Sequence, residues 1–228
     1  MGQHSYFTDD LFQFLKELRQ HNERDWFQQN KERYETAVRD PFISFIGDLG
    51  GPLKKINSHM VADPRPVGGS MMRIYRDIRF SRDKSPYKTS VAAHFWHSQG
   101  KEGATPAYYL HLEPGQSMIG AGIWRPESGA LKKVRDAIVT DSKRWQRVTS
   151  SADFRSSCGM AGESLKRPPA GYDASHPMIE DIKRKDFATS SPLDDRQVCG
   201  PDFMGSVLGA FRASAPFVQF LSDAIGLA

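Results

Sequence analysis

Basic residues are concentrated in one segment of this chain, residues 65–88, which holds seven lysines or arginines and two aspartates. Its net charge of +5 exceeds the +4 of the whole 228-residue chain, so the rest of the protein is close to neutral. From Arg73 the segment reads RIYRDIRFSRDKSPYK, with tyrosine and phenylalanine between the cations. Because arginine can hold a phosphate or carboxylate group through two parallel hydrogen bonds, the segment predicts an anion-binding element. Its candidate anion-binding cations are Arg73, Arg76, Arg79, Lys84 and Lys88.

Histidine and glutamate gather on strand-like sequence that follows the basic segment. Side chains two residues apart on a strand point to the same face, so Tyr109, His111 and Glu113 share one face. His94 shares a face with Lys88 on the preceding strand-like segment. Such a face could transfer protons, with His94 or His111 as general acid or base and Glu113 orienting the imidazole. Tyr109 would add a hydrogen bond to the bound anion. Two imidazoles and a carboxylate could instead hold a divalent metal, but no metal-binding motif supports that alternative.

Two glycines, Gly120 and Gly122, fall on the same predicted face, together with Trp124. Glycine weakens the interior of a strand, and one reason to keep it there is close approach of a ligand or of another backbone. We therefore expect a concave pocket beside His111. The alternative is a solvated face, which is common in antiparallel sheets.

The basic segment also has a purely structural interpretation. Asp77 and Asp83 lie close enough in sequence to form ion pairs with its arginines, and exposed pairs of this kind add little stability. Against this interpretation, the turn at residues 84–88 leads directly into the strand that bears His94. A basic rim joined in this way to a face of histidine and glutamate fits the binding of phosphate, carboxylate or nucleotide.

Apolar residues at three- and four-residue spacing predict helices on both sides of these segments. N-terminal helices are predicted to begin at Thr8, near Asp25 and at Pro41. Later helices are predicted over residues 126–138, 142–148, 177–187 and 203–225. We expect Pro216 to kink or split the last of them.

Strands and loops occupy the middle of the chain in this prediction. The predicted strands are residues 70–75, 90–97, 107–113 and 118–124. The turn at residues 114–116 predicts that the last two form an antiparallel hairpin. Loops are expected at residues 58–70 and 149–163, and an extended proline-rich segment at residues 166–177.

These elements predict a single α+β domain over residues 1–228, with an antiparallel sheet (about residues 70–124) packed against N- and C-terminal helices. Apolar content of 39% and charged content of 25% suit a soluble globular protein. No apolar run approaches the ~20 residues that span a bilayer, so no membrane partner is expected. The N-terminus lacks a signal-peptide pattern. The two cysteines, Cys158 and Cys199, lack metal-site spacing, so we expect free thiols in the cytoplasm.

Motifs for common cofactors and nucleophiles are absent from the sequence. It contains no phosphate-binding Gly-x-x-x-x-Gly-Lys-Ser/Thr loop, no Gly-x-Gly-x-x-Gly after a strand, no Gly-x-Ser-x-Gly elbow and no His-Glu-x-x-His. The sequence therefore assigns no cofactor, and it does not indicate an oligomeric state.

Several stretches of the chain are similar to one known family, called domain of unknown function 2461, which comprises conserved hypothetical proteins of bacteria and fungi. The matching stretches are residues 22–27, 30–35, 62–65, 73–88, 109–115, 120–124, 166–173 and 183–187. They run over nearly the whole chain, and the long arginine motif is specific. The resemblance implies a single α+β domain. It implies no activity, cofactor or catalytic residue, because none is established for the family.

Three hypotheses about function follow. The first is a cytoplasmic protein with an anion-binding pocket, either a binding protein or an enzyme acting on a phosphorylated or carboxylated small molecule, with His94, His111 and Glu113 transferring protons. The second is a protein that binds nucleic acid or a ribonucleoprotein, with affinity that falls steeply as salt rises. The third is a protein-interaction scaffold without catalysis, for which we expect a flat, filled sheet face.

Overall fold

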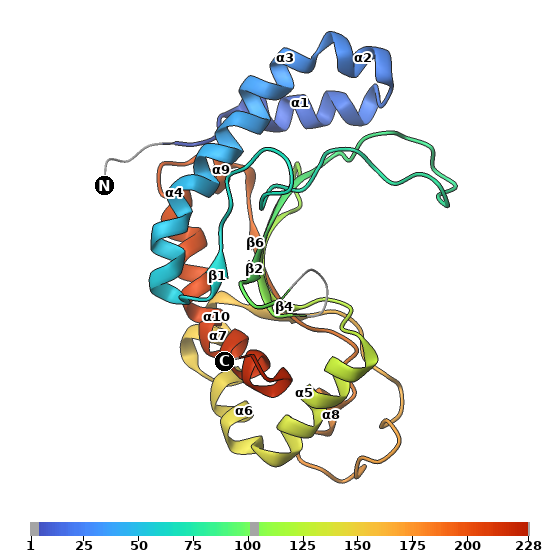
Figure 1. Cartoon of the computed structure of the whole chain (residues 1–228), viewed down its shortest axis with the longest axis vertical. Helices are drawn as coiled ribbons and strands as arrows, with labels where there is room; N and C mark the ends of the chain where they lie inside the picture. The colour runs from blue at the N-terminus through green and yellow to red at the C-terminus, as the bar shows by residue number, and fades with distance from the viewer. Residues whose placement is uncertain (1–4, 101–104, 228) are drawn as a thin grey trace.

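Six strands of the described chain form one antiparallel sheet (Figure 1). The computed structural model describes residues 5–100 and 105–227. The strands are β1 (Met60–Val61), β2 (Val91–His97), β3 (Ala107–Leu112), β4 (Ser117–Ile123), β5 (Gly159–Ala161) and β6 (Phe187–Leu193). They lie in the order β1-β2-β3-β4-β6-β5. The α+β class predicted from the sequence is confirmed, and β3 and β4 form the predicted hairpin.

The chain before the sheet is helical over most of its length. Its elements are α1 (Asp9–Gln20), α2 (Arg24–Gln29), α3 (Lys31–Tyr34), the π-helical turn η1 (Glu35–Arg39) and α4 (Asp40–Ile56). The turn η1 joins α3 to α4 shortly before Pro41. Proline has no N–H to donate, so the regular α-helical bonding must change near it, and a π turn is one such change.

The helices after β4 lie mostly at the other end of the sheet (Figure 1). They are α5 (Ser128–Thr140), α6 (Ser142–Thr149), α7 (Ala152–Ser157), α8 (Ile179–Ile182), α9 (Asp195–Cys199) and α10 (Phe203–Ile225). The exception is α9, which lies beside the N-terminal helices (Figure 1). The helix α10 continues through Pro216 as one element. Among the described helices, none is both long enough and apolar enough to cross a membrane.

The long helix α10 packs along one face of the sheet and forms much of the core. The ring centroid of Phe211 lies 4.4 Å from that of Tyr108 and 5.8 Å from that of Phe95. All three side chains are fully buried. A second cluster surrounds the buried Trp145 of α6, which packs against Phe217 further along α10. Burial of these aromatic rings fixes which face of the sheet is covered.

Three predictions about individual elements are wrong. Residues 70–75 form only isolated bridges, Met71 with Ala93 and Tyr75 with Tyr87, and no strand. The predicted loop at residues 149–163 contains α7 and β5.

The third error concerns residues 177–187, which the sequence spacing assigned to one helix, and the strand β6, which was not predicted. The helix α8 ends at Ile182, and Phe187 begins the strand. Pro192 lies in this strand beyond the end of β5, which pairs only as far as Ser190, so its missing N–H leaves no partner unsatisfied on that side. The sheet therefore extends from residue 60 to residue 193 instead of residues 70–124.

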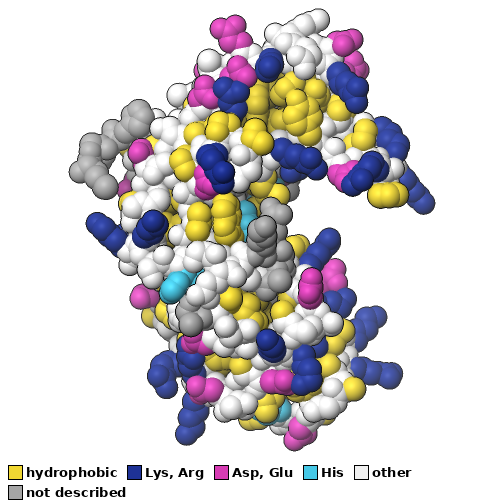
Figure 2. Space-filling model, in the orientation of Figure 1, with side chains coloured by type: hydrophobic (Ala, Val, Ile, Leu, Met, Phe, Trp, Pro, Cys, Tyr) yellow, Lys and Arg dark blue, Asp and Glu magenta, His cyan; other side chains and the backbone are white. Residues whose placement is uncertain are grey.

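Residues 62–90 leave the sheet after β1, project from it as a long loop and return at β2 (Figure 1). We call this segment the basic arm. The helices α4 and α10 lie on one side of the sheet, and the arm extends on the other side (Figure 1). Figure 2 shows the molecule hollowed on that side, with lysine and arginine side chains along the edge of the hollow. Within residues 5–100 and 105–227, one face of the sheet therefore has no helical cover.

The base of the basic arm is anchored to the N-terminal helices. The side-chain amide of Asn22 donates to the carbonyl oxygen of Tyr87 and accepts from its N–H, both at 3.0 Å. The ring of Phe27 stacks on Tyr87, with centroids 4.1 Å apart. These contacts hold the returning strand of the arm in place before it enters the sheet.

Candidate functional site

The sheet register brings most of the predicted polar side chains onto one face. In β2 and β3, Ala92 lies opposite His111 and His94 lies opposite Tyr109. In β3 and β4, Tyr109 lies opposite Gly120. These residues belong to the face that α10 leaves uncovered, because their neighbours in sequence face the core.

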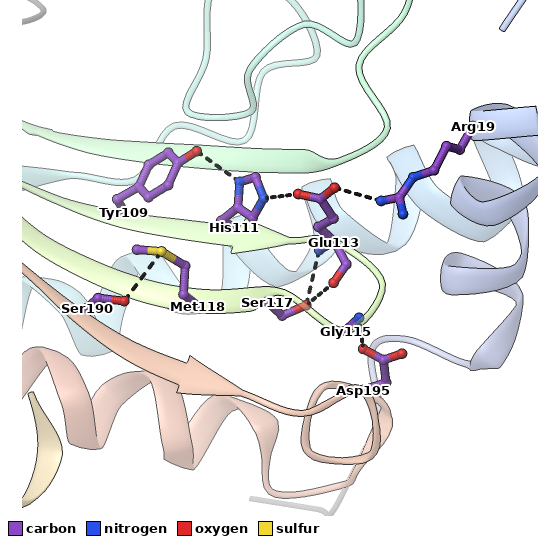
Figure 3. Close-up of polar contacts among 9 residues, drawn as sticks. All are labelled: Arg19, Tyr109, His111, Glu113, Gly115, Ser117, Met118, Ser190 and Asp195. Atoms are coloured by element: carbon purple, nitrogen blue, oxygen red, sulfur yellow. Dashed lines mark hydrogen bonds and ion pairs between the residues drawn. The ribbon is translucent and has the colours of Figure 1, made fainter. Parts of the chain in front are cut away.

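Four polar side chains on this side of the molecule form a continuous chain (Figure 3). The Tyr109 hydroxyl lies 3.2 Å from His111 Nδ1, and His111 Nε2 lies 3.0 Å from Glu113 Oε2. Arg19 of α1 donates from Nη2 to Glu113 Oε1 at 2.7 Å. Glu113 is therefore fixed on both oxygens, once by the sheet and once by the first helix.

This arrangement changes the role that the sequence suggested for His111. A carboxylate can only accept hydrogen bonds, so Nε2 carries the proton toward Glu113 and Nδ1 accepts from the Tyr109 hydroxyl. Both ring nitrogens are then occupied. The outer end of the chain is the Tyr109 hydroxyl, and burial together with the Glu113 charge raises the pKa of that hydroxyl. Tyr109 is therefore protonated at neutral pH.

His94 is the remaining predicted proton-transfer residue. It lies opposite Tyr109 in the register, and its backbone N–H donates to the Ser70 carbonyl at 2.9 Å. Among the described residues, no group of three or more His, Cys, Asp or Glu side chains is arranged to hold a metal ion. The structure therefore gives no support to a metal held by His94, His111 and Glu113.

A groove of about 420 Å³ lies at the base of the basic arm. Residues from α1, the loop after it and the arm line it: Arg19, Asn22, Arg76, Asp83, Ser85, Tyr87, Lys88, Thr89 and Ser90. Arg19 belongs to both the groove and the polar chain, since it also bonds Glu113. The groove and the face of histidine and glutamate are thus joined through one arginine.

Three of the predicted anion-binding cations are engaged within the arm itself. Arg76 pairs with Asp83, and Arg79 pairs with Asp77 at 2.7 Å. Lys84 donates to the Ile78 carbonyl at 3.0 Å. The pKa of Asp77 is lowered mainly by its hydrogen bond to Arg79, and that of Asp83 by Ser85 first and then by Arg76. These three cations therefore follow the structural interpretation, in which the cations of the segment are paired within the segment.

Lys88 and Arg73 differ from the other predicted cations. Neither forms a hydrogen bond or ion pair with another described residue through its side chain. Lys88 is half-buried and Arg73 is exposed. Burial lowers the pKa of Lys88, and the nearby charge of Arg73 lowers it further. Both effects disfavour the charged form of Lys88, and a nearby anion would favour it.

The sequence explained Gly120 and Gly122 by a predicted pocket, and the structure explains them differently. A Cβ on Gly122 would lie 2.1 Å from the Phe187 carbonyl oxygen, and the φ of Gly122 is +114°. A Cβ on Gly120 would lie 3.3 Å from the Thr189 carbonyl oxygen and from Met118 Cε. Close approach of the β6 backbone, and not of a ligand, is what these glycines permit.

Comparison with known families gives one match. The family described as conserved hypothetical protein (DUF2461) matches residues 10–220. The chain belongs to this family. The match confirms the resemblance seen in the sequence, and it spans the basic arm, the groove and the polar chain. No curated protein and no solved structure matches the chain.

Two residues of the site were missed by sequence reasoning. Arg19 and Asn22 follow one another closely at the end of α1, where they read as ordinary polar residues on an exposed helix end. Arg19 lies 94 positions from Glu113 in sequence. No local pattern signals a pairing over that distance.

Proposed function

We propose that this protein binds a phosphate-bearing or carboxylate-bearing ligand in the groove at the base of the basic arm. The observation that supports this proposal is Lys88, a half-buried cation that lines the groove and whose side chain forms no ion pair with another described residue. The charge of Arg73 lies near it. Three other arginines of the arm, Arg65, Arg76 and Arg79, are already paired with aspartates. Lys88 is therefore the cation that a ligand would find available inside the groove.

The surroundings of Lys88 suit an oxyanion. Thr89 and Ser90 line the same groove and can supply hydroxyl donors. Arg19 and Arg76 also line it, each already paired with a carboxylate, Glu113 and Asp83 respectively. Charge-assisted hydrogen bonds of this kind are short and about twice as strong as neutral ones. A tetrahedral phosphate group, which carries several acceptor oxygens, can use more of these donors than a chloride ion can.

Thermal unfolding in the presence of small anions tests this proposal. Phosphate at a hundredfold excess over its Kd adds about 2.7 kcal/mol of stability, or about 5–10 °C in Tm for a chain of this size. We expect phosphate, and to a lesser degree sulfate, to raise Tm relative to sodium chloride at equal ionic strength. Equal Tm values in phosphate and chloride would contradict the proposal.

Proton transfer on the uncovered sheet face is a second candidate function, and the polar chain of Tyr109, His111 and Glu113 favours it. Arg19 joins the other end of this chain to the groove. Glu113 orients the imidazole, the imidazole polarises the Tyr109 O–H, and Arg19 holds Glu113 in position. A group supported in this way can act as a general acid or base toward a bound ester. Tyr109, and not His111, is the end of the chain, because both ring nitrogens of His111 already have partners.

We expect Tyr109→Phe to lower any turnover of phosphate or carboxylate esters by about 10²–10⁴-fold, because it removes the hydroxyl and keeps the ring. Nitrogen-15 NMR of the His111 imidazole gives a second readout, since Nδ1 loses its donor in this variant. Tyr172→Phe is the matched control, because it removes a hydroxyl that bonds Asp136 and lines neither groove. Turnover in Tyr109→Phe equal to that in the control would contradict the assignment.

We also propose that the protein works in the cytoplasm. Both cysteines, Cys158 and Cys199, are free thiols. Burial raises the pKa of each, so neither is an activated thiolate. Fractionation of cells that express the tagged protein tests this placement, and recovery outside the cytoplasm would contradict it.

A further inference from the structure

We infer that the ligand of the groove is a single-stranded nucleic acid, with phosphates at Lys88 and Arg73 and bases against the aromatic residues of the basic arm. This inference rests on the proposed function and specifies its ligand. It comes from a second groove beside the first and from the aromatic side chains that the arm exposes.

The second groove has a volume of about 360 Å³ and a different character. Its lining combines aromatic and apolar side chains with two arginines and one amide: Arg24, Gln28, Tyr75, Arg76, Ile78, Pro86 and Tyr87. Arg76 and Tyr87 line both grooves, so the two adjoin at the base of the arm. One groove suits phosphate, and its neighbour suits a planar apolar ring. A nucleotide carries both groups covalently joined.

Tyr75 is positioned for a base to stack on its ring in this second groove. One side of the residue packs against Tyr87, with ring centroids 5.4 Å apart, and Tyr87 is itself stacked on Phe27. The side chain of Tyr75 nevertheless stays 52% exposed. Three aromatic rings in contact form a supported platform, and bases stack on such platforms without regard to sequence.

Phe80 extends the same surface beyond the grooves. It is 95% exposed, which is unusual for phenylalanine, and the Arg79 guanidinium lies 5.8 Å from its ring centre. The arm between the grooves and Phe80 carries Arg79 and Arg82, both exposed. A mononucleotide would fill the grooves and leave Phe80 unused. A polynucleotide strand would reach it, which is why we infer a strand and not a free nucleotide.

Duplex nucleic acid does not fit this surface, because its bases are already stacked inside the helix. Bases of a single strand can separate and lie on aromatic rings, while the positive charge follows the backbone. The hollow beside the arm gives a flexible strand room to approach the grooves (Figure 2).

Fluorescence anisotropy with a labelled twelve-nucleotide oligothymidylate tests the inference on the full chain. We expect this strand to bind more tightly than AMP as competitor and more tightly than a duplex of the same length. The affinity should fall as salt rises. Phe80→Ala should weaken binding by about tenfold, since stacking contributes about 1–3 kcal/mol per base, and should leave Tm unchanged because the ring is exposed.

Val67→Ala is the matched control, because Val67 lies on the same arm and is 88% exposed but has no ring. We expect its affinity to equal that of the wild type. Tyr75→Ala, checked for an unchanged Tm, gives a second aromatic variant. Equal binding of the duplex and the strand, equal affinities for AMP and the strand, or equal effects of Phe80→Ala and Val67→Ala would each overturn the inference.

The same experiments separate this inference from the proposed function. If phosphate raises Tm but the oligonucleotide does not bind, the groove holds an anion and the inference about nucleic acid is wrong. If neither phosphate nor the oligonucleotide has an effect, both are wrong.

Discussion

Lys88→Met is expected to abolish most of the phosphate-dependent stabilisation while leaving the anion-free protein as stable as the wild type or slightly more stable. Methionine keeps the length and apolar stem of the side chain and removes the charge. A lost charge-assisted hydrogen bond is equivalent to about 1.5–3 kcal/mol, so phosphate should bind about 10–150-fold more weakly. Tm without phosphate should be equal or higher by up to about 2–4 °C, which corresponds to about 1 kcal/mol.

The sign of the stability effect follows from the pKa of Lys88. Its pKa in the folded protein is lowered by burial and by Arg73, so the unfolded chain holds the proton more tightly. The charged lysine therefore opposes folding at neutral pH, and this opposition disappears as pH rises toward its ordinary value of about 10.4. A bound phosphate reverses the effect by stabilising the ammonium. A residue that only supported the fold would show the opposite behaviour, and its removal would lower Tm.

Lys84→Met is the matched control for this substitution. Lys84 lies four positions earlier on the same arm and donates to the Ile78 carbonyl, and it does not line the groove. We expect it to keep the full phosphate effect on Tm. Arg73→Gln removes a charge near Lys88 but outside the groove lining, so it should weaken the phosphate effect less than Lys88→Met does. Arg79→Gln should behave like the control. Equal phosphate responses in all four variants would show that the arm binds anions only through its overall charge.

Gly122→Ala is expected to destabilise the protein by about 2–5 kcal/mol, measured by urea or thermal unfolding. An added Cβ would lie 2.1 Å from the Phe187 carbonyl oxygen and 2.9 Å from a ring carbon of Phe217. The φ of +114° adds backbone strain for any residue with a side chain. Overpacking costs about 1–3 kcal/mol and such backbone strain costs a similar amount. The β4–β6 pairing and the packing of α10 on β4 should both loosen, since Phe187 lies in β6 and Phe217 in α10.

Gly129→Ala provides the control for this second prediction. Gly129 lies in α5, and a Cβ there would meet no atom within 4 Å. Replacing glycine by alanine in a helix with free space stabilises by about 0.4–1 kcal/mol. The two substitutions should therefore shift Tm in opposite directions. A Gly122→Ala variant as stable as the wild type would show that β6 does not approach β4 as closely as the structure has it.

The central hairpin and its polar face could be predicted from the sequence because they depend on local rules. Alternation of side chains along β2, β3 and β4 placed His94, Tyr109 and His111 on one face, and the tight turn at residues 114–116 set the hairpin. Each of these strands follows its neighbour closely in the chain. The strand β6 could not be found in this way, because it joins β4 from about seventy positions later and carries a proline.

The motif alone could not predict which of its arginines form ion pairs with aspartates. Arg79 and Asp77 are two positions apart, but Arg76 finds its partner Asp83 seven positions away, across the turn of the arm. Arg73 has the same neighbours in sequence and forms no such pair with a described residue. Which cations remain available depends on how the arm folds back on itself, and spacing alone does not determine that.

The most direct test of anion binding at the base of the arm is an NMR titration of the Lys88 side chain, with and without phosphate. The resonance is assigned by its absence from Lys88→Met. In the free protein we expect a pKa below the ordinary lysine value, and phosphate should raise it, because a bound anion favours the charged form. A Lys88 pKa that phosphate leaves unchanged, with Tm also unaffected, would contradict anion binding in this groove.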